Sequence, residues 1–192
     1  MIRQWIKTCL FAVFLVLAAP MAALSAFGRF HAPFYFFAQA CALVPGILGD
    51  YLRICYYRLT LTRCDLSSRI QFGSFFSHPQ ASIASSVYIG SYCVLGRVDI
   101  GERTQISSGV MIPSGKRQHG RAADGSIESS NLDHFETVSI GADCWIGTSA
   151  VILAPIGAQS TIGAGAVVVK AIPAGVTAVG NPARILDPKE SS

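Results

Sequence analysis

The stretches VSIGADCWIGTSAVIL (residues 138–153) and IGAQSTIGAGAVVVKAIPAGVTAVGNPAR (residues 156–184) decide the fold of this chain. An aliphatic residue returns at every sixth position, and a glycine or another small residue usually follows it. The same period reaches back to Ile83, and its runs are Ile83, Ile89 and Leu95; Ile100, Ile106 and Ile112; Ile140, Ile146 and Ile152; Ile156, Ile162 and Val168. A six-residue period fits neither a helix nor an alternating strand. It predicts a solenoid whose coils each consist of three short strands, with the aliphatic side chains pointing inward.

The repeat has one long interruption, residues 113–137, which contains two of the four histidines, His119 and His134. Loops longer than about 12–15 residues without structure of their own are uncommon unless they are functional or disordered. We therefore expect the chemistry in this segment, called the arm below. Its polar middle, GRAADGSIESSN, is long enough to reach a neighbouring subunit; the alternative is an insertion whose only role is to carry His119.

The amino-terminal third is apolar. Asp, Glu, Lys and Arg are absent from residues 8–28 and again from residues 30–49. The first of these stretches would reach about 30 Å as a helix, the thickness of a bilayer core. We predict a membrane anchor or hairpin with an interfacial helix in residues 1–63, the solenoid in residues 64–186, and a tail in residues 187–192. A cleaved secretory signal is the alternative for the first segment, and a cap packed on the first coil is the alternative for the helix around residues 49–59.

The net charge of +4 divides unevenly, with +5 through Arg63 and −1 in the remaining chain. Arg53, Arg58 and Arg63 therefore face anionic lipid headgroups in one interpretation and form a solvated helix face in the other. Neither interpretation indicates a nucleic-acid partner. A single membrane span would place the solenoid outside, whereas two passes or a re-entrant hairpin return it to the cytoplasm beside these cations. We expect the cytoplasmic placement.

Six cysteines occur without any CxxC pair, a pattern that indicates neither a metal cluster nor a disulfide framework. We interpret them as small buried hydrophobic residues in a reducing compartment, and we predict no metal site.

The two quoted stretches resemble hexapeptide-repeat acyltransferases, in particular the branch of galactoside, maltose and xenobiotic acetyltransferases and exopolysaccharide-modifying acetyltransferases. The resemblance covers roughly residues 70–186 and rests on the order W-I-G, G-A-G, V-K-x-I-P and G-N-P-A-R. It implies an all-β left-handed parallel β-helix, a homotrimer, acetyl-CoA as co-substrate and a histidine as general base. Sugar nucleotidyltransferases, γ-type carbonic anhydrases and non-catalytic scaffolds share the bare repeat.

The resemblance implies roles for eight residues. His119, in SGKRQHGR, matches the catalytic histidine, although its spacing from Gly115 is longer than in relatives; its basic neighbours Lys116, Arg117 and Arg121 would keep it neutral and able to accept a proton. His134, near Asp133 and Glu136, would support the arm or close over the acceptor, and Trp145 would line the acceptor pocket or an interface. The coenzyme A arm would run between two solenoids of the trimer, along Thr148, Ala164, Val169, Lys170 and Arg184.

The sequence therefore predicts a membrane-associated O-acetyltransferase that moves an acetyl group from acetyl-CoA directly to a hydroxyl of a sugar, or of an envelope or exopolysaccharide precursor. The alternatives are an N-acyltransferase acting on an amino sugar or peptide amine, and a catalytically silent, membrane-bound scaffold. A carbonic anhydrase would need three histidine ligands around zinc, and the spacing of His78, His119 and His134 indicates no such cluster.

Overall fold

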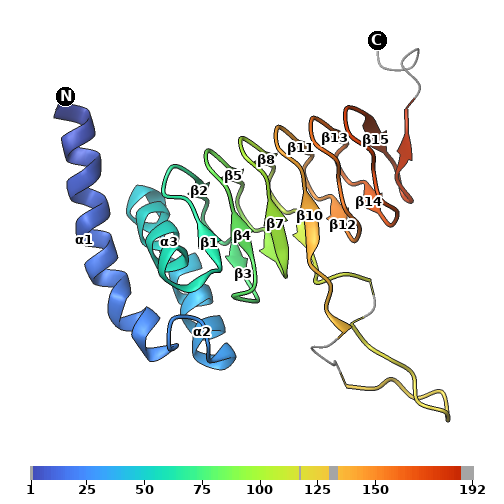
Figure 1. Cartoon of the computed structure of the whole chain (residues 1–192), viewed down its shortest axis with the longest axis horizontal. Coiled ribbons are helices and arrows are strands. Elements are labelled where there is room, and N and C mark those ends of the chain that lie inside the picture. Colours follow the sequence, from blue (N-terminus) through green and yellow to red (C-terminus); the bar gives the residue numbers. More distant parts are fainter. Residues whose placement is uncertain (1, 117, 130–133, 187–192) are drawn as a thin grey trace.

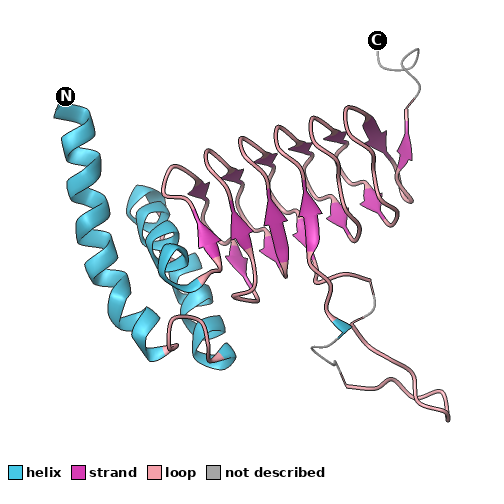
Figure 2. Cartoon of the chain, in the orientation of Figure 1, coloured by secondary structure: helices cyan, strands magenta, loops and turns pink. Residues whose placement is uncertain are grey.

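The computed structural model describes residues 2–116, 118–129 and 134–186, with the side chains of residues 2–4 left out. Three helices gather at the amino-terminal end, and a solenoid of short strands extends from them (Figure 1). Helices and strands do not alternate along the chain, so the helices form a separate cap on one end of the solenoid (Figure 2).

The cap consists of α1 (Ile2–Leu24), α2 (His31–Ala42) and α3 (Gly46–Thr60). Within α1, the stretch Trp5–Leu24 is long and apolar enough to cross a membrane, and most of it is exposed. The 12 residues of α2 span only about 18 Å, too short to cross. α3 packs between α1 and the first coil, with Tyr56 and Tyr57 fully buried.

The strands form three sheets of parallel strands, and each of the first four coils contributes one strand to each sheet. The later coils continue the first sheet only through the isolated bridges of Ile156 and Ile172. Sheet A contains β1 (Arg63–Cys64), β4 (Ser82–Ile83), β7 (Val98–Ile100) and β10 (Val138–Ile140). Sheet B contains β2 (Arg69–Ile70), β5 (Tyr88–Ile89), β8 (Gln105–Ile106), β11 (Trp145–Ile146), β13 (Thr161–Ile162) and β15 (Thr177–Val179), and ends with the antiparallel β16 (Arg184–Ile185). Sheet C contains β3 (Phe75–Phe76), β6 (Val94–Leu95), β9 (Met111–Ile112), β12 (Val151–Ile152) and β14 (Val167–Val168).

The predicted solenoid is confirmed, and every aliphatic residue of the four runs is buried. In the strand register, inward isoleucines of neighbouring coils lie directly over one another, for example Ile89 over Ile106 and Ile146 over Ile162. One coil precedes the predicted run and places Cys64, Ile70 and Phe76 inward. The left-handed sense stays a prediction from the resemblance.

The small residues after the inward positions leave room for the next coil. A Cβ at Gly90 would lie 2.6 Å from the backbone nitrogen of Ser108, and one at Gly141 would lie 2.3 Å from that of Ala158. Close approach of the next coil therefore requires these glycines, and neither has a positive φ. Positive φ occurs instead three residues before the inward side chain, for example at Tyr92.

The helical cap closes the edge that the first coil would otherwise leave unpaired. The backbone N–H of Gly73 donates to the carbonyl of Ala42 at 2.9 Å, and that of Phe76 donates to the Tyr57 hydroxyl at 3.0 Å. The Nε of Arg53 donates to the carbonyl of Ile70 at 2.9 Å. Unpaired edge groups are costly when buried and invite association when exposed, so the cap completes the solenoid.

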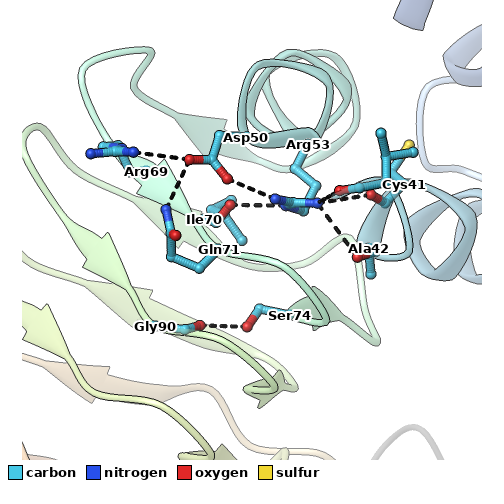
Figure 3. A network of polar contacts seen from close by, with 10 residues as sticks. Cys41, Ala42, Asp50, Arg53, Arg69, Ile70, Gln71, Ser74 and Gly90 are labelled. Atoms are coloured by element: carbon cyan, nitrogen blue, oxygen red, sulfur yellow. Dashed lines mark hydrogen bonds and ion pairs between the residues drawn. The ribbon is translucent and has the colours of Figure 1, made fainter. Parts of the chain in front are cut away.

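Arg53 is wholly buried, which corrects the prediction that it meets lipid headgroups (Figure 3). Its Nη1 donates to the carbonyls of Cys41 (3.1 Å) and Val44 (2.7 Å) at the carboxyl end of α2, where a cation also complements the helix dipole. Its Nη2 donates to Asp50 at 2.7 Å. The helix around residues 49–59 is therefore the cap packed on the first coil, while Arg58 and Arg63 are exposed.

Five of the six cysteines are buried small residues, as predicted. Cys9 on α1 is exposed, and all six are free thiols.

Candidate active site

The arm leaves the solenoid after β9 in sheet C and re-enters at β10 in sheet A. It projects away from the solenoid axis (Figure 1). Its described middle is a small hairpin in which the N–H of Ala122 donates to the carbonyl of Ser126 (3.0 Å) and that of Glu128 to the carbonyl of Gly120 (3.1 Å). Asp124 accepts from the backbone and hydroxyl of Ser126 at 2.9 and 2.6 Å, an Asx turn that sets the hairpin.

His119 is exposed on this hairpin, and its Nδ1 lies 3.2 Å from the carbonyl oxygen of Glu128. A carbonyl only accepts hydrogen bonds, so the proton of the neutral ring belongs on Nδ1. Nε2 then carries the lone pair that can accept a proton, as a general base needs.

The predicted basic surroundings of His119 are present in part. Lys116 is exposed near the start of the arm. Arg121 donates from Nη1 to the carbonyl of Gly125 at 2.8 Å, so it braces the hairpin turn. Arg117 lies outside the described residues.

His134 lies exposed on the returning limb of the arm, just before β10. Its neighbour Asp133, part of the predicted acidic surroundings, lies outside the described residues. Glu136 donates its backbone N–H to the carbonyl of Ser114 at 3.1 Å, so the two limbs join where they meet the solenoid.

The arm root is a cluster that sequence reasoning missed: His31, His78, Arg97, Ser114 and Phe135. Arg97 donates from Nη1 to the carbonyl of Phe135 at 3.3 Å, and its guanidinium lies 5.5 Å from the centre of that ring. The rings of His78 and Phe135 meet edge to face at 5.1 Å, and His31 of α2 lies 5.1 Å from His78. The Ser114 hydroxyl accepts from the Arg97 backbone at 2.9 Å.

Burial, together with the smaller effects of His31 and Arg97, lowers the pKa of His78 to about 4. His78 is therefore a neutral packing residue near pH 7, and it links the cap to the arm. The signal that would have found it is the stacking of coils, because His78 and Arg97 follow equivalent strands of sheet C.

The predicted donor residues fall on two neighbouring corners of the solenoid. Thr148 and Ala164 lie at the corner between sheets B and C, where the N–H of Gly165 donates to the Thr148 carbonyl at 2.8 Å. Val169 and Lys170 follow β14 at the corner between sheets C and A, the corner from which the arm leaves. The structure thus places these residues in two pairs, one at each edge of sheet C.

Trp145 and Arg184 lie on the remaining face. The Trp145 side chain is 58% exposed on sheet B, between Gln105 and Thr161 of the neighbouring coils. Arg184 begins β16, the antiparallel strand that ends the same sheet. His119 and four of the five predicted donor residues are exposed: Thr148, Ala164, Lys170 and Arg184. On a single chain the site is therefore an open surface.

The described part of the chain contains no group of three or more His, Cys, Asp or Glu residues arranged to hold a metal ion. The carbonic anhydrase alternative therefore finds no candidate centre in residues 2–116, 118–129 and 134–186.

The described residues therefore form a parallel solenoid of three-sided coils, interrupted by an arm that carries His119 and His134. The chain matches no protein-family model and no curated protein sequence. Among solved structures it is similar to a maltose O-acetyltransferase from Clostridium difficile, with 22% identity, a TM-score of 0.63, and coverage of 82% of this chain and 85% of that one.

Two further structures share the fold. One is a hexapeptide-repeat acetyltransferase from Vibrio cholerae complexed with acetyl coenzyme A: 20% identity, TM-score 0.57, covering 85% of this chain and 90% of the other. Another is AntD, an N-acyltransferase from Bacillus cereus in complex with dTDP-4-amino-4,6-dideoxyglucose and coenzyme A: 16% identity, TM-score 0.51, covering 62% of this chain and 69% of the other. The predicted resemblance is thereby confirmed at the level of the fold.

Proposed function

We propose that this protein is an acetyl-CoA-dependent O-acetyltransferase with His119 as the general base. The observation that carries the proposal is the hydrogen bond between Nδ1 of His119 and the Glu128 carbonyl, which leaves Nε2 free to take a proton. The shared fold supports the activity, since the solved structures with this fold include a maltose O-acetyltransferase and an acetyltransferase complexed with acetyl-CoA.

In this proposal acetyl-CoA supplies the acetyl thioester, and the chain supplies the proton transfers. Nε2 of His119 removes the proton of the acceptor hydroxyl as its oxygen attacks the thioester carbonyl. The Glu128 carbonyl stabilises the imidazolium through the Nδ1 proton. His119 then returns the proton to the departing thiolate, so the products are the acetyl ester and free coenzyme A, without a covalent enzyme intermediate.

We assign the donor site to Thr148, Ala164, Val169, Lys170 and Arg184, with the cations Lys170 and Arg184 on phosphate groups. Because these residues form an open surface on one chain, a second copy completes the site, which supports a homotrimer whose arms reach neighbouring subunits. His134 and Trp145 are proposed to contact the acceptor.

The exposed apolar residues of the cap support attachment to a membrane. On α1 they include Val13, Val16 and Leu17, each more than half exposed, and Phe36 of α2 and Ile47 of α3 are exposed as well. With the solenoid in the cytoplasm, beside its donor acetyl-CoA, a membrane-bound envelope or exopolysaccharide precursor is the acceptor we propose. Such an enzyme would act in polysaccharide biosynthesis.

The first test is the melting temperature of the full chain in detergent against rising acetyl-CoA, because a ligand that binds only the folded state raises apparent stability. We expect a saturable rise that weakens in Arg184→Ala and persists in His119→Ala. No rise at millimolar acetyl-CoA would refute this donor.

The second test is release of free coenzyme A with a panel of sugar and lipid-linked glycan acceptors. His119→Ala should lower kcat by about 100- to 10,000-fold, whereas His134→Ala should lower it less. Turnover by His119→Ala within threefold of the parent would overturn the assignment of the base, and a scaffold would show no turnover by any variant.

AntD is an N-acyltransferase crystallised with an amino sugar nucleotide, and it favours a second candidate, transfer to an amine. The acceptor panel therefore includes amino sugars. Turnover restricted to them would replace O-transfer by N-transfer while leaving the role of His119 unchanged.

A further inference from the structure

A cavity of about 690 Å³ lies between the first half of α1, the first turns of α3 and the first coil, at the end of the molecule away from the arm. Its volume is within the range of about 300–1,000 Å³ typical of small-molecule sites. One part of its lining is apolar and includes Leu10, Phe11, Ile54 and Leu66. The other part is polar and includes Lys7 and Arg69.

The polar side of the cavity carries excess positive charge. Asp50 is the acid that lines it, and its carboxylate already accepts from Arg53 (2.7 Å), Arg69 (3.0 Å) and Gln71 (2.9 Å), as Figure 3 shows. Among the residues that line the cavity, the two cations Lys7 and Arg69 exceed the single carboxylate of Asp50 by one charge. The Arg69 side chain is 60% exposed, and Lys7 is exposed with its Nζ 5.9 Å from the centre of the Phe11 ring.

An apolar cleft between two helices, bordered by cations, matches the chemistry of an amphiphile with an anionic head. The apolar walls suit an alkyl chain, since each buried CH₂ contributes about 0.8 kcal/mol. Cations at the opening suit a phosphate, because charge-assisted hydrogen bonds from Lys and Arg to phosphate are stronger than neutral ones. The wholly buried Arg53 adds charge behind the site and fixes the position of Asp50.

We propose that this cavity binds one anionic phospholipid, with an acyl chain between α1 and α3 and the phosphate between Lys7 and Arg69. The site is distinct from the proposed acetyl-transfer site, because the arm leaves the solenoid two coils further on, after β9. The bound lipid would fill the cavity between α1 and α3 and hold α1 against α3. Lipid binding at this cavity does not depend on the proposed acetyltransferase activity.

The test uses the full chain in a neutral detergent, with native mass spectrometry to count retained lipid. The probes are dioleoyl-phosphatidylglycerol, dioleoyl-phosphatidylcholine and inorganic phosphate. We expect one phosphatidylglycerol to bind at least fivefold more tightly than phosphatidylcholine, in line with a contribution of about 1 kcal/mol per cation near an anionic headgroup. Inorganic phosphate at equal concentration should not displace it.

Lys7→Gln and Arg69→Gln should each weaken phosphatidylglycerol binding about fivefold and leave phosphatidylcholine binding unchanged. Arg58→Gln removes an exposed cation of α3 that does not line the cavity, so it is the matched control and should change neither. Leu10→Trp, which fills the apolar part, should lower binding of both lipids with the melting temperature of the lipid-free protein kept.

Three results would overturn the proposal. Equal affinity for the two lipids would remove the role of the cations. An Arg58→Gln variant as impaired as Lys7→Gln would show diffuse surface attraction. Full displacement by inorganic phosphate would show a simple anion site without an acyl chain.

Discussion

Replacing Arg53 with methionine should destabilise the whole cap, and the contacts of Arg53 allow the loss to be estimated. The substitution removes the hydrogen bonds to four carbonyls, those of Ile70 (2.9 Å), Val44 (2.7 Å), Cys41 (3.1 Å) and Ala42 (3.4 Å), and the ion pair with Asp50 (2.7 Å). Two losses are softened, because Asp50 keeps Arg69 and Gln71, and the Ala42 carbonyl keeps the N–H of Gly73.

Breaking one partner of a buried charged network costs about 3–5 kcal/mol, and the apolar methionine side chain returns little because it leaves buried carbonyls without donors. We take about 4 kcal/mol as the central value. For a chain of this size, each kcal/mol moves the melting temperature by about 2–4 °C, so the expected fall is about 8–16 °C.

The assay is thermal unfolding in detergent, followed by tyrosine and tryptophan fluorescence. Arg53→Lys keeps one charge but loses the fork of donors, so its melting temperature should lie between those of the parent and Arg53→Met. Arg58→Met changes an exposed arginine on the same helix and should stay within about 1 kcal/mol of the parent. An Arg53→Met variant that melts within 2 °C of the parent would refute our account of how the cap closes the solenoid.

Three further predictions concern the arm root and the coils. Phe135→Ala removes the ring that contacts both His78 and Arg97. The arm would then be misplaced, and kcat for acetyl transfer should fall about 10- to 100-fold in the coenzyme A release assay. Phe135→Leu should retain most of the activity. Because the pKa of His78 falls from 6.5 to about 4 on folding, the unfolded chain binds more protons between these pH values, and the stability of the folded protein should drop as pH falls through that window. His78→Gln should reduce the difference in melting temperature between pH 7 and pH 5. An unchanged difference would contradict this account. Gly141→Ala places a Cβ 2.3 Å from the nitrogen of Ala158 and should cost about 1–3 kcal/mol in thermal unfolding, whereas Ser139→Ala, on the exposed side of β10, should be nearly neutral.

The column of inward side chains was predictable because aliphatic side chains occupy the buried position on each side of a coil, and this position returns every six residues. The prediction stopped one coil short, since the first coil uses Cys64 and Phe76 at two inward positions. That His119 lies on an arm outside the coils was predictable from the interruption of the repeat, while its catalytic role stays a prediction. The hairpin around it could have been expected from Asp124-Gly125-Ser126, a turn sequence.

The arm root and the buried arginine were not predictable for a physical reason. His78 and Phe135 meet only because the solenoid stacks their coils and the arm folds back over the corner. An arginine on an amphipathic helix ordinarily faces solvent, and Arg53 turns inward because the open edge of the first coil and the end of α2 both present carbonyls to it. Such a preference exists only in the assembled structure.

The number of coils between the cap and the arm sets the distance between them along the solenoid axis. Neighbouring parallel strands lie about 4.8 Å apart, and the arm leaves the third coil and enters the fourth, so it sits about 10–14 Å from the first coil along the solenoid axis. If the cap rests on a bilayer as proposed, this height is set by the number of coils below the arm. A homologous coil inserted below it would lift the reacting histidine by about 4.8 Å, which would change the length of membrane-tethered acceptor that the site can reach while leaving its chemistry intact.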